Sequence, residues 1–143
     1  GGAELVADEL AGHLAGRAEV EVVDLADAEP GALDASRLHL VVCSTYGDGE
    51  VPTSVRPFVR ALEEDGASLV GLRYAVLGMG DRSYARTYSR GSELVDEALA
   101  ARGARRVGEY GRHDASGPLD AGDVARDWVD GVLAADEVRM ARV

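Results

Sequence analysis

Two glycine-flanked loops carry the residues of this chain that are best suited to chemistry. Residues 44–50 read Ser-Thr-Tyr-Gly-Asp-Gly-Glu, and residues 78–84 read Gly-Met-Gly-Asp-Arg-Ser-Tyr. Each loop follows an apolar run and places one tyrosine, Tyr46 or Tyr84, among residues that favour backbone freedom over bulk. If the two runs are neighbouring strands, loops at their carboxyl ends could hold a flat aromatic ligand between them.

The two tyrosines have a plainer interpretation as rim residues on ordinary loops. Aromatic residues make up only 5% of the chain, so a tyrosine in each glycine-rich loop stands out. Stacking of a planar heterocycle on an aromatic side chain contributes roughly 1–3 kcal/mol per contact. Together the two loops favour the ligand-binding interpretation.

The composition indicates one globular domain. A chain of 143 residues with 46% hydrophobic residues has the usual size of a single domain, and it shows no repeat or linker. Because aromatic residues are few, alanine, valine and leucine must fill the core. The one cysteine, Cys43, lies in an apolar run, where we expect a core thiol in a reducing, cytoplasmic environment.

The charge balance excludes some partners. Twenty-six acidic and 15 basic residues give a net charge of −11, which argues against nucleic acid as a partner. The negative charge suits a partner protein with a basic docking surface, or it serves solubility alone. No run approaches the ~18 to 20 apolar residues that a membrane-spanning helix needs, so we expect no membrane partner.

Hydrophobic periodicity predicts an α/β fold. We expect helices over residues 4–15, 54–64 and 89–101, and a last helix from Asp120 or Asp123 to about residue 134. The expected strands span residues 19–23, 38–43, 73–77 and 105–110, with a loop over 111–119. In the first helix, Leu5, Val6, Leu10 and Leu14 fall near one stripe. This alternation predicts a parallel sheet with helices on both faces.

Other chemistries find little support in the sequence. Residues 78–83 resemble a dinucleotide fingerprint but lack its third glycine. His13, His39 and His113 have no metal-ligand spacing, and we expect His39 to be a partly buried structural residue. Ser44 lacks the elbow motif of a hydrolase nucleophile. We therefore expect no catalytic residue and no metal site.

The two loops resemble those of the flavodoxin family. Residues 43–52 (Cys-Ser-Thr-Tyr-Gly-Asp-Gly-Glu-Val-Pro) are similar to the family's first flavin loop, and residues 77–84 (Leu-Gly-Met-Gly-Asp-Arg-Ser-Tyr) to its second. Residues 1–4 resemble the segment after the phosphate loop, and the helix with Trp128 the closing helix. The likeness is to short stand-alone, MioC-like members and to the FMN domains of sulfite reductase and cytochrome P450 reductase.

The resemblance implies a flavodoxin-like three-layer sandwich over residues 1–135, with residues 136–143 as a C-terminal tail. The family's strand order is 2-1-3-4-5, and its first strand and most of its phosphate loop have no counterpart in the 143 residues. Because that strand is central, its absence removes two hydrogen-bond ladders. We interpret this as a truncated sequence or a misplaced start.

The resemblance also implies FMN as the cofactor and assigns its binding residues. They are Gly1, Gly2, Ala3, Ser44, Thr45, Tyr46, Gly47, Asp48, Gly49, Gly78, Met79, Gly80, Asp81, Ser83 and Tyr84. In flavodoxins the peptide at Gly47 turns over when the flavin takes up an electron, although a tight turn needs glycine in any case. Negative charge at Asp48, Glu50 and Asp81 would disfavour the anionic reduced flavin, unless solvent screens it.

The function implied is that of an electron carrier rather than a catalyst with its own substrate. It would take single electrons from an NADPH-linked flavoprotein reductase and pass them to an acceptor enzyme, as a cytoplasmic monomer. The alternative is a binding or regulatory module that has lost FMN. The missing phosphate loop and Thr87, which departs from the family's usual phenylalanine, favour it, and the two intact tyrosine loops count against it. A third option is an FMN-using reductase of small quinones.

Overall fold

The computed structural model describes residues 2–44, 55–66, 68–80, 90–114 and 117–140. Within these residues the chain forms a four-stranded parallel sheet and four α-helices. The elements follow one another as α1 (Gly2–Leu14), the 3-10 turns η1 (Leu25–Asp27) and η2 (Pro30–Ala32), β1 (Leu38–Ser44), α2 (Val55–Asp65), β2 (Arg73–Gly80), α3 (Arg90–Ala101), β3 (Arg105–Arg106), β4 (Gly111–Asp114) and α4 (Ala121–Met140).

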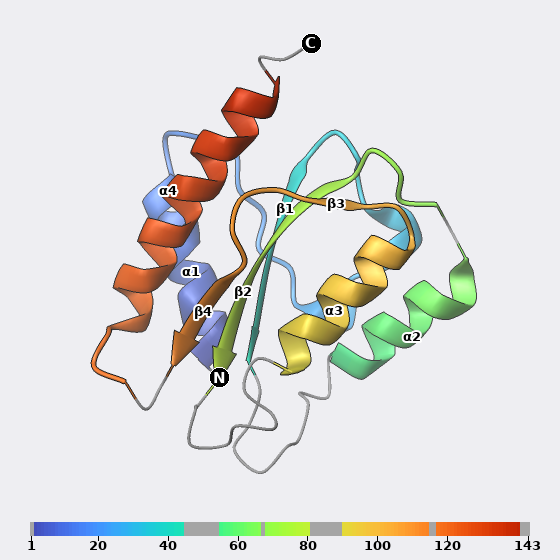
Figure 1. The fold of residues 1–143 in the computed structure, drawn as a ribbon, viewed down its shortest axis with the longest axis horizontal. Helices are drawn as coiled ribbons and strands as arrows, with labels where there is room; N and C mark the ends of the chain where they lie inside the picture. The colour runs from blue at the N-terminus through green and yellow to red at the C-terminus, as the bar shows by residue number, and fades with distance from the viewer. Residues whose placement is uncertain (1, 45–54, 67, 81–89, 115–116, 141–143) are drawn as a thin grey trace.

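The helices cover both faces of the sheet, as the sequence predicts. Helices α1 and α4 lie on one face and α2 and α3 on the other (Figure 1). Strand β2 is central because β1 pairs with one of its edges and β3 and β4 with the other. The predicted α/β class with a parallel sheet is confirmed.

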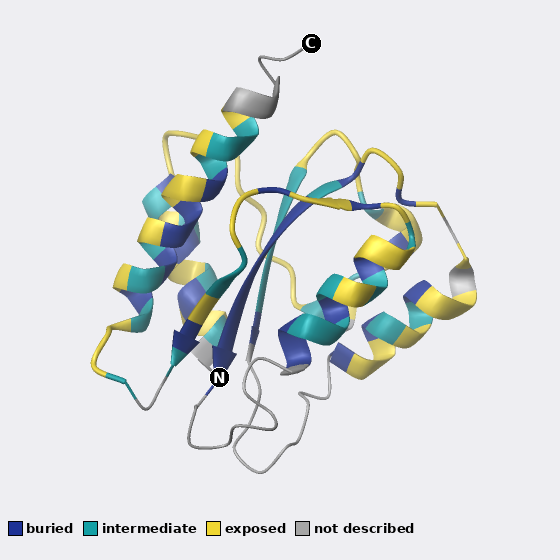
Figure 2. Cartoon of the chain, in the orientation of Figure 1, coloured by how far each residue is buried: buried dark blue, intermediate teal, exposed yellow. Residues whose placement is uncertain are grey.

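The buried side chains of β2 divide between two cores. Ala75, Leu77 and Met79 join the cluster beneath α1 and α4, whereas Tyr74 and Val76 join the cluster beneath α2 and α3. This division follows from the two-residue period of a strand, which sends successive side chains to opposite faces. A strand covered on both faces must be apolar throughout, which explains the nearly continuous apolar run. Figure 2 shows β2 buried along its length.

The inner stripe of α1 differs from the predicted stripe at one residue. Val6, Leu10 and Leu14 are each 4% exposed and pack in the α1–α4 core, at the i, i+4, i+8 spacing of one helix face. Leu5 is 73% exposed, so its assignment to the stripe is wrong. The reason is geometric, because residue 5 is turned about 100° from residue 6 at 3.6 residues per turn.

The predicted strand over residues 19–23 does not form. Residues 19–24 belong to no helix or strand, and Val20, Val22 and Val23 are 40%, 50% and 53% exposed. A strand is stabilised by a neighbouring strand, and among the described residues β1 pairs only with β2. The segment with alternating valines therefore has no strand beside it, among the described residues, with which to form backbone hydrogen bonds.

The last predicted strand is divided into two. Arg105 and Arg106 pair with the start of β2, and Val107 N still donates to the Tyr74 carbonyl oxygen at 2.7 Å. Residues 108–110 then leave the ladder, and Gly111–Asp114 pair with the end of β2. Gly108 has a φ of +72°, a backbone conformation that breaks an extended run and favours glycine. The expected loop over 111–119 therefore begins with a strand.

Helix α4 is longer than predicted. It continues to Met140, beyond the expected end near residue 134. Asp136 forms an ion pair with Arg73 at the start of β2, and their side chains are only 16% and 14% exposed. The described part of the proposed tail is therefore helical and bonded to the sheet. The division between residues 1–135 and 136–143 stays a prediction.

Candidate functional site

The carboxyl ends of β1 and β2 lie side by side. In the parallel register Cys43 is the Cα partner of Gly78, and Ser44 is the partner of Met79. Both strands therefore end at the same level of the sheet. In the sequence, the two predicted loops, residues 45–50 and 81–84, directly follow these neighbouring strand ends.

Helix α1 begins at the same edge. In Figure 1 the first turn of α1 lies near the carboxyl ends of β1 and β2, and Ala3 packs against the core cluster that contains Met79. The N–H groups in the first turn of an α-helix have no partner within the helix, and they can bind an anion. The edge thus combines two strand ends with one helix N-terminus.

Six of the predicted binding residues fall within the described part of the chain. They are Gly2, Ala3, Ser44, Gly78, Met79 and Gly80. Gly78 and Gly80 are buried at the end of β2, and the Met79 side chain is 9% exposed within the α1–α4 core. Met79 can therefore offer a ligand its backbone but not its side chain.

The other predicted binding residues lie outside the described residues. They are Gly1, Thr45, Tyr46, Gly47, Asp48, Gly49, Asp81, Ser83 and Tyr84. Glu50, Thr87 and Tyr88 lie outside as well. Their roles at the edge stay predictions.

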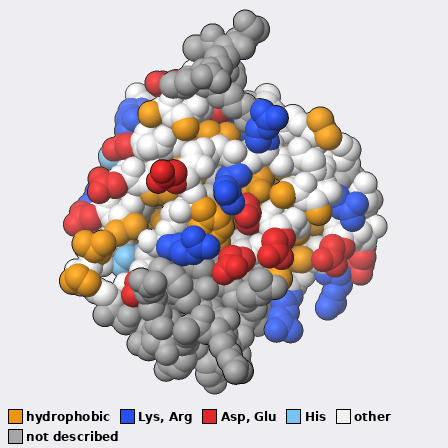
Figure 3. Space-filling model, in the orientation of Figure 1, with side chains coloured by type: hydrophobic (Ala, Val, Ile, Leu, Met, Phe, Trp, Pro, Cys, Tyr) orange, Lys and Arg blue, Asp and Glu red, His pale blue; other side chains and the backbone are white. Residues whose placement is uncertain are grey.

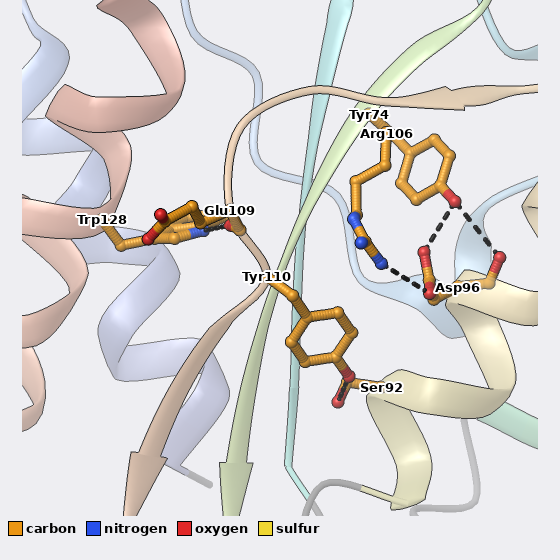
Figure 4. Close-up of polar contacts among 7 residues, drawn as sticks. All are labelled: Tyr74, Ser92, Asp96, Arg106, Glu109, Tyr110 and Trp128. Atoms are coloured by element: carbon orange, nitrogen blue, oxygen red, sulfur yellow. Dashed lines mark hydrogen bonds and ion pairs between the residues drawn. The ribbon is translucent and has the colours of Figure 1, made fainter. Parts of the chain in front are cut away.

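A polar cluster beside this edge was not predicted from the sequence. The hydroxyl groups of Tyr110 and Ser92 form a hydrogen bond that joins the segment before β4 to the first turn of α3 (Figure 4). The guanidinium of Arg112 lies 4.2 Å from the centroid of the Tyr110 ring, and that of Arg106 lies 5.4 Å away. Burial raises the pKa of Tyr110 to about 12, so its hydroxyl stays protonated.

The cluster continues through Asp96 to the start of β2. The Tyr74 hydroxyl donates to Asp96 Oδ1 at 2.6 Å, and Arg106 Nη1 donates to Asp96 Oδ2 at 3.0 Å. Burial, followed by the hydrogen bond to Asp96, raises the pKa of Tyr74. These contacts fix α3 against β2 and β3, and with them the place where α3 begins after residues 81–89.

A second unpredicted contact fixes β4 on the other face of the sheet. Trp128 Nε1 donates to the carbonyl oxygen of Glu109 at 3.2 Å (Figure 4). Its ring lies against Gly111, where an added Cβ would be only 2.6 Å from Trp128 Cδ1. Trp128 thus holds the chain on both sides of Tyr110.

The cysteine and the histidines have structural surroundings. Cys43 is buried, and burial raises the pKa of its thiol to about 12, so the predicted core thiol is confirmed. His39 is partly buried, as expected. The His113 ring bonds through Nε2 to the Leu119 carbonyl oxygen at 2.8 Å. Among the described residues no group of histidine, cysteine, aspartate or glutamate could hold a metal ion.

Comparison with known proteins identifies the family. The flavodoxin family model matches residues 1–128, which is most of the chain. The chain belongs to the flavodoxin family. FMN is the cofactor of flavodoxins and electron transfer is their function, so both expectations about the family are confirmed. The described strands β1, β2 and β3/β4 stand in the order of the family's third, fourth and fifth strands.

Two relatives are similar in sequence to most of this chain. Flavodoxin YqcA of Pectobacterium carotovorum is 36% identical over 131 residues, which cover 91% of this chain and 86% of the relative. A bifunctional cytochrome P450/NADPH–P450 reductase of Bacillus cereus is 41% identical over 103 residues, and the match spans only 10% of that protein's length.

A solved structure supports the fold. A cysteine-to-serine mutant of the flavodoxin from Pseudomonas aeruginosa has a TM-score of 0.78 and 34% sequence identity, covering 93% of this chain and 89% of that chain. In the described residues, no helix combines the length and the apolar character that crossing a bilayer requires.

Proposed function

We propose that this chain binds FMN and carries single electrons from an NADPH-linked reductase to an acceptor protein. The observation that supports it most is the register of β1 and β2, which ends with Ser44 opposite Met79. Two loops that begin at such neighbouring points can place Tyr46 and Tyr84 on opposite faces of a flat ring system. The tyrosine positions themselves belong to the proposal.

The described residues fit FMN in two respects. The N-terminus of α1 lies at the edge where β1 and β2 end, and Gly2 and Ala3 can offer N–H groups to a phosphate. Gly78 and Gly80 have no Cβ, so the backbone at the end of β2 can approach a ring closely. The remaining assigned residues are Gly1, Ser44, Thr45, Gly47, Asp48, Gly49, Met79, Asp81 and Ser83.

In this proposal the role of the protein residues is to hold FMN and to set its reduction potential. Bound FMN supplies the capacity to take up and release electrons one at a time, so the chain needs no acid, base or nucleophile. Carboxylates at Asp48, Glu50 and Asp81 would disfavour added negative charge beside the ring. Each ~1.4 kcal/mol of that effect lowers a one-electron potential by about 59 mV. A low-potential carrier is the expected result.

The partners are inferred from charge and from the relatives. A net charge of −11 favours docking on a basic surface of the partner, through complementary electrostatics. The Bacillus cereus relative is named as a cytochrome P450 joined to an NADPH–P450 reductase, which supports electron exchange between proteins of these kinds. We further propose a cytoplasmic monomer, and size-exclusion chromatography tests the oligomeric state.

The test is FMN titration of protein expressed from its complete gene, followed by quenching of flavin fluorescence. We expect a saturable 1:1 complex with flavin absorption. Tyr46→Ser and Tyr84→Ser should each weaken binding about 5- to 150-fold, which corresponds to the loss of about 1–3 kcal/mol of stacking. Tyr110→Phe is the matched control, because Tyr110 contacts Ser92 and two arginines instead.

Two outcomes would contradict the proposal. A folded protein that leaves flavin fluorescence unchanged would favour the module that has lost FMN. Binding that is equally tight in both loop variants would place the cofactor elsewhere.

A further inference from the structure

The outer surfaces of α2 and α3 form a groove that the proposed cofactor site does not use. Two adjoining hollows, of about 200 and 340 Å³, lie along it. Both are lined by Val59, Glu63 and Leu94, so they form one continuous depression between the two helices. In Figure 1, α2 and α3 run side by side in the same direction.

The floor of the groove is apolar. Val59, Leu94 and Ala98 line it, and all three pack against the core cluster beneath α2 and α3. Ala101 extends the floor toward the end of α3 and is exposed. Because the core supports the floor from below, the groove is a fixed feature of these two helices.

The two ends of the groove differ in charge. Arg56 and Arg60 line the end where α2 begins, Glu63 lies between the two hollows and lines both, and Glu97 lines only the part nearer the helix C-termini. Arg102, at that far end, donates to the carbonyl oxygens of Leu62 and Glu63. In Figure 3 basic side chains project over the first half of α2.

Arg56 and Arg60 have no acidic partner in the part of the chain that the structure describes. Other arginines do have one, such as Arg73 with Asp136 and Arg106 with Asp96. A guanidinium binds a carboxylate with two parallel hydrogen bonds and carries little hydration. Two such groups, one helical turn apart beside an apolar floor, form a surface that complements an apolar segment with carboxylates.

We propose that this groove binds an amphipathic α-helix of another protein. The apolar stripe of that helix occupies the floor formed by Val59, Leu94 and Ala98, and its carboxylates contact Arg56 and Arg60. A helix fits because α2 and α3 present ridges at i, i+3 and i+4 spacing, which receive apolar side chains at the same spacing. The acidic end of the bound helix lies toward the start of α2.

The negative charge of the whole chain does not prevent this contact. The chain carries a net charge of −11, but at physiological ionic strength charges farther away than about 8 Å are largely screened. The charges within the groove therefore decide the interaction: Arg56 and Arg60 attract carboxylates at one end, and Glu63 and Glu97 repel them from the rest. The groove is built from α2 and α3 and not from the cofactor loops, so the inference does not depend on FMN.

The test uses a display library of 16-residue helical peptides with randomised apolar and charged positions, selected against the FMN-treated protein. We expect enrichment of peptides with an i, i+3/i+4, i+7 apolar stripe and clustered Asp or Glu at one end. Fluorescence anisotropy of the selected peptide then compares wild type with Arg56→Glu/Arg60→Glu, which should bind about tenfold more weakly or worse. Arg37→Glu/Arg105→Glu is the matched control, since it makes the same charge change at two exposed arginines that do not line the groove.

The outcomes separate this inference from the proposed function. Amide shifts on peptide binding should map to α2 and α3, and flavin quenching should be the same in the Arg56→Glu/Arg60→Glu variant. The inference is overturned if the library yields no helical binder, if both double variants bind the peptide equally, or if the shifts map elsewhere. A wild-type protein that does not bind FMN would contradict only the proposed function and not the helix-binding groove.

Discussion

Tyr110 and Ser92 share a hydrogen bond between hydroxyl groups that lie 18 residues apart in the chain. The bond connects the residue before β4 to the first turn of α3, and Ser92 is completely buried. The segment before β4 and helix α3 are therefore joined at the point where α3 begins. The position of that helix start depends on a contact between side chains and not on local propensity alone.

Removing this bond should destabilise the protein without removing the tyrosine ring. Tyr110→Phe keeps the contacts with Arg106 and Arg112, and a hydrogen bond of this kind contributes about 1 kcal/mol. Urea unfolding of Tyr110→Phe, Ser92→Ala and the double variant should give a coupling of about 0.5–1.5 kcal/mol. Additive effects of the two substitutions would show that the hydroxyls do not interact.

Gly111 is required for the close approach of Trp128. An added Cβ would lie 2.6 Å from Trp128 Cδ1 and 2.9 Å from Leu77 Cδ1, and both side chains belong to the core. We expect Gly111→Ala to lower the free energy of unfolding by about 1–3 kcal/mol through overpacking. Chemical denaturation followed by the fluorescence of Trp128 measures the change.

Gly131 provides the matched control for this prediction. It lies inside α4, and an added Cβ would have no neighbouring atom within 4 Å, so the substitution meets open space. Gly131→Ala should raise the free energy of unfolding by about 0.5–1 kcal/mol, because alanine favours a helix interior. The prediction is wrong if the two glycine substitutions shift stability in the same direction.

The Arg73–Asp136 pair should make the end of α4 part of the folded domain. Its side chains are 14% and 16% exposed, and a hydrogen bond to a charged group contributes about 1.5–3 kcal/mol. We expect Asp136→Asn, and a chain ending at Ala135, to lose about 2 kcal/mol of stability. The exposed pair of Arg37 and Glu21 is the control, since Glu21→Gln should cost less than about 1 kcal/mol. A chain ending at Ala135 with unchanged stability would support residues 136–143 as a separate tail.

The Cys43 thiol should make stability fall at alkaline pH. Burial raises its pKa in the folded protein to about 12, above the ~8.5 of an unfolded thiol. Between these values the folded state keeps a proton that the unfolded state loses, so rising pH favours unfolding. The slope approaches about 1.4 kcal/mol per pH unit. Urea unfolding from pH 7.5 to 10 should show a steeper decline for wild type than for Cys43→Ala, and equal declines would contradict the assignment.

The sequence by itself determined the alternation of helices and strands and the parallel sheet. These follow from local patterns: the apolar runs at residues 38–43 and 73–77 predict strands, and the structure extends the second to Gly80. The stripe of Leu5, Val6, Leu10 and Leu14 predicts the inner face of a helix, correctly except at Leu5. The glycine-rich loops after two strands also indicated the edge where a ligand would bind. The sequence can predict these features because the repeat of apolar residues along a helix or strand depends only on residues that are close together in the sequence.

The tertiary structure alone decided which side chains meet and which strands find a neighbour. Residues 19–23 have the pattern of a strand but form none, since a strand also needs a ladder to join. Three contacts join segments that are distant in the sequence: Tyr110 with Ser92, Trp128 with Gly111, and Arg73 with Asp136. The types of these residues do not indicate which residue each of them will contact. The groove along α2 and α3 exists only because two parallel crossovers place these helices side by side.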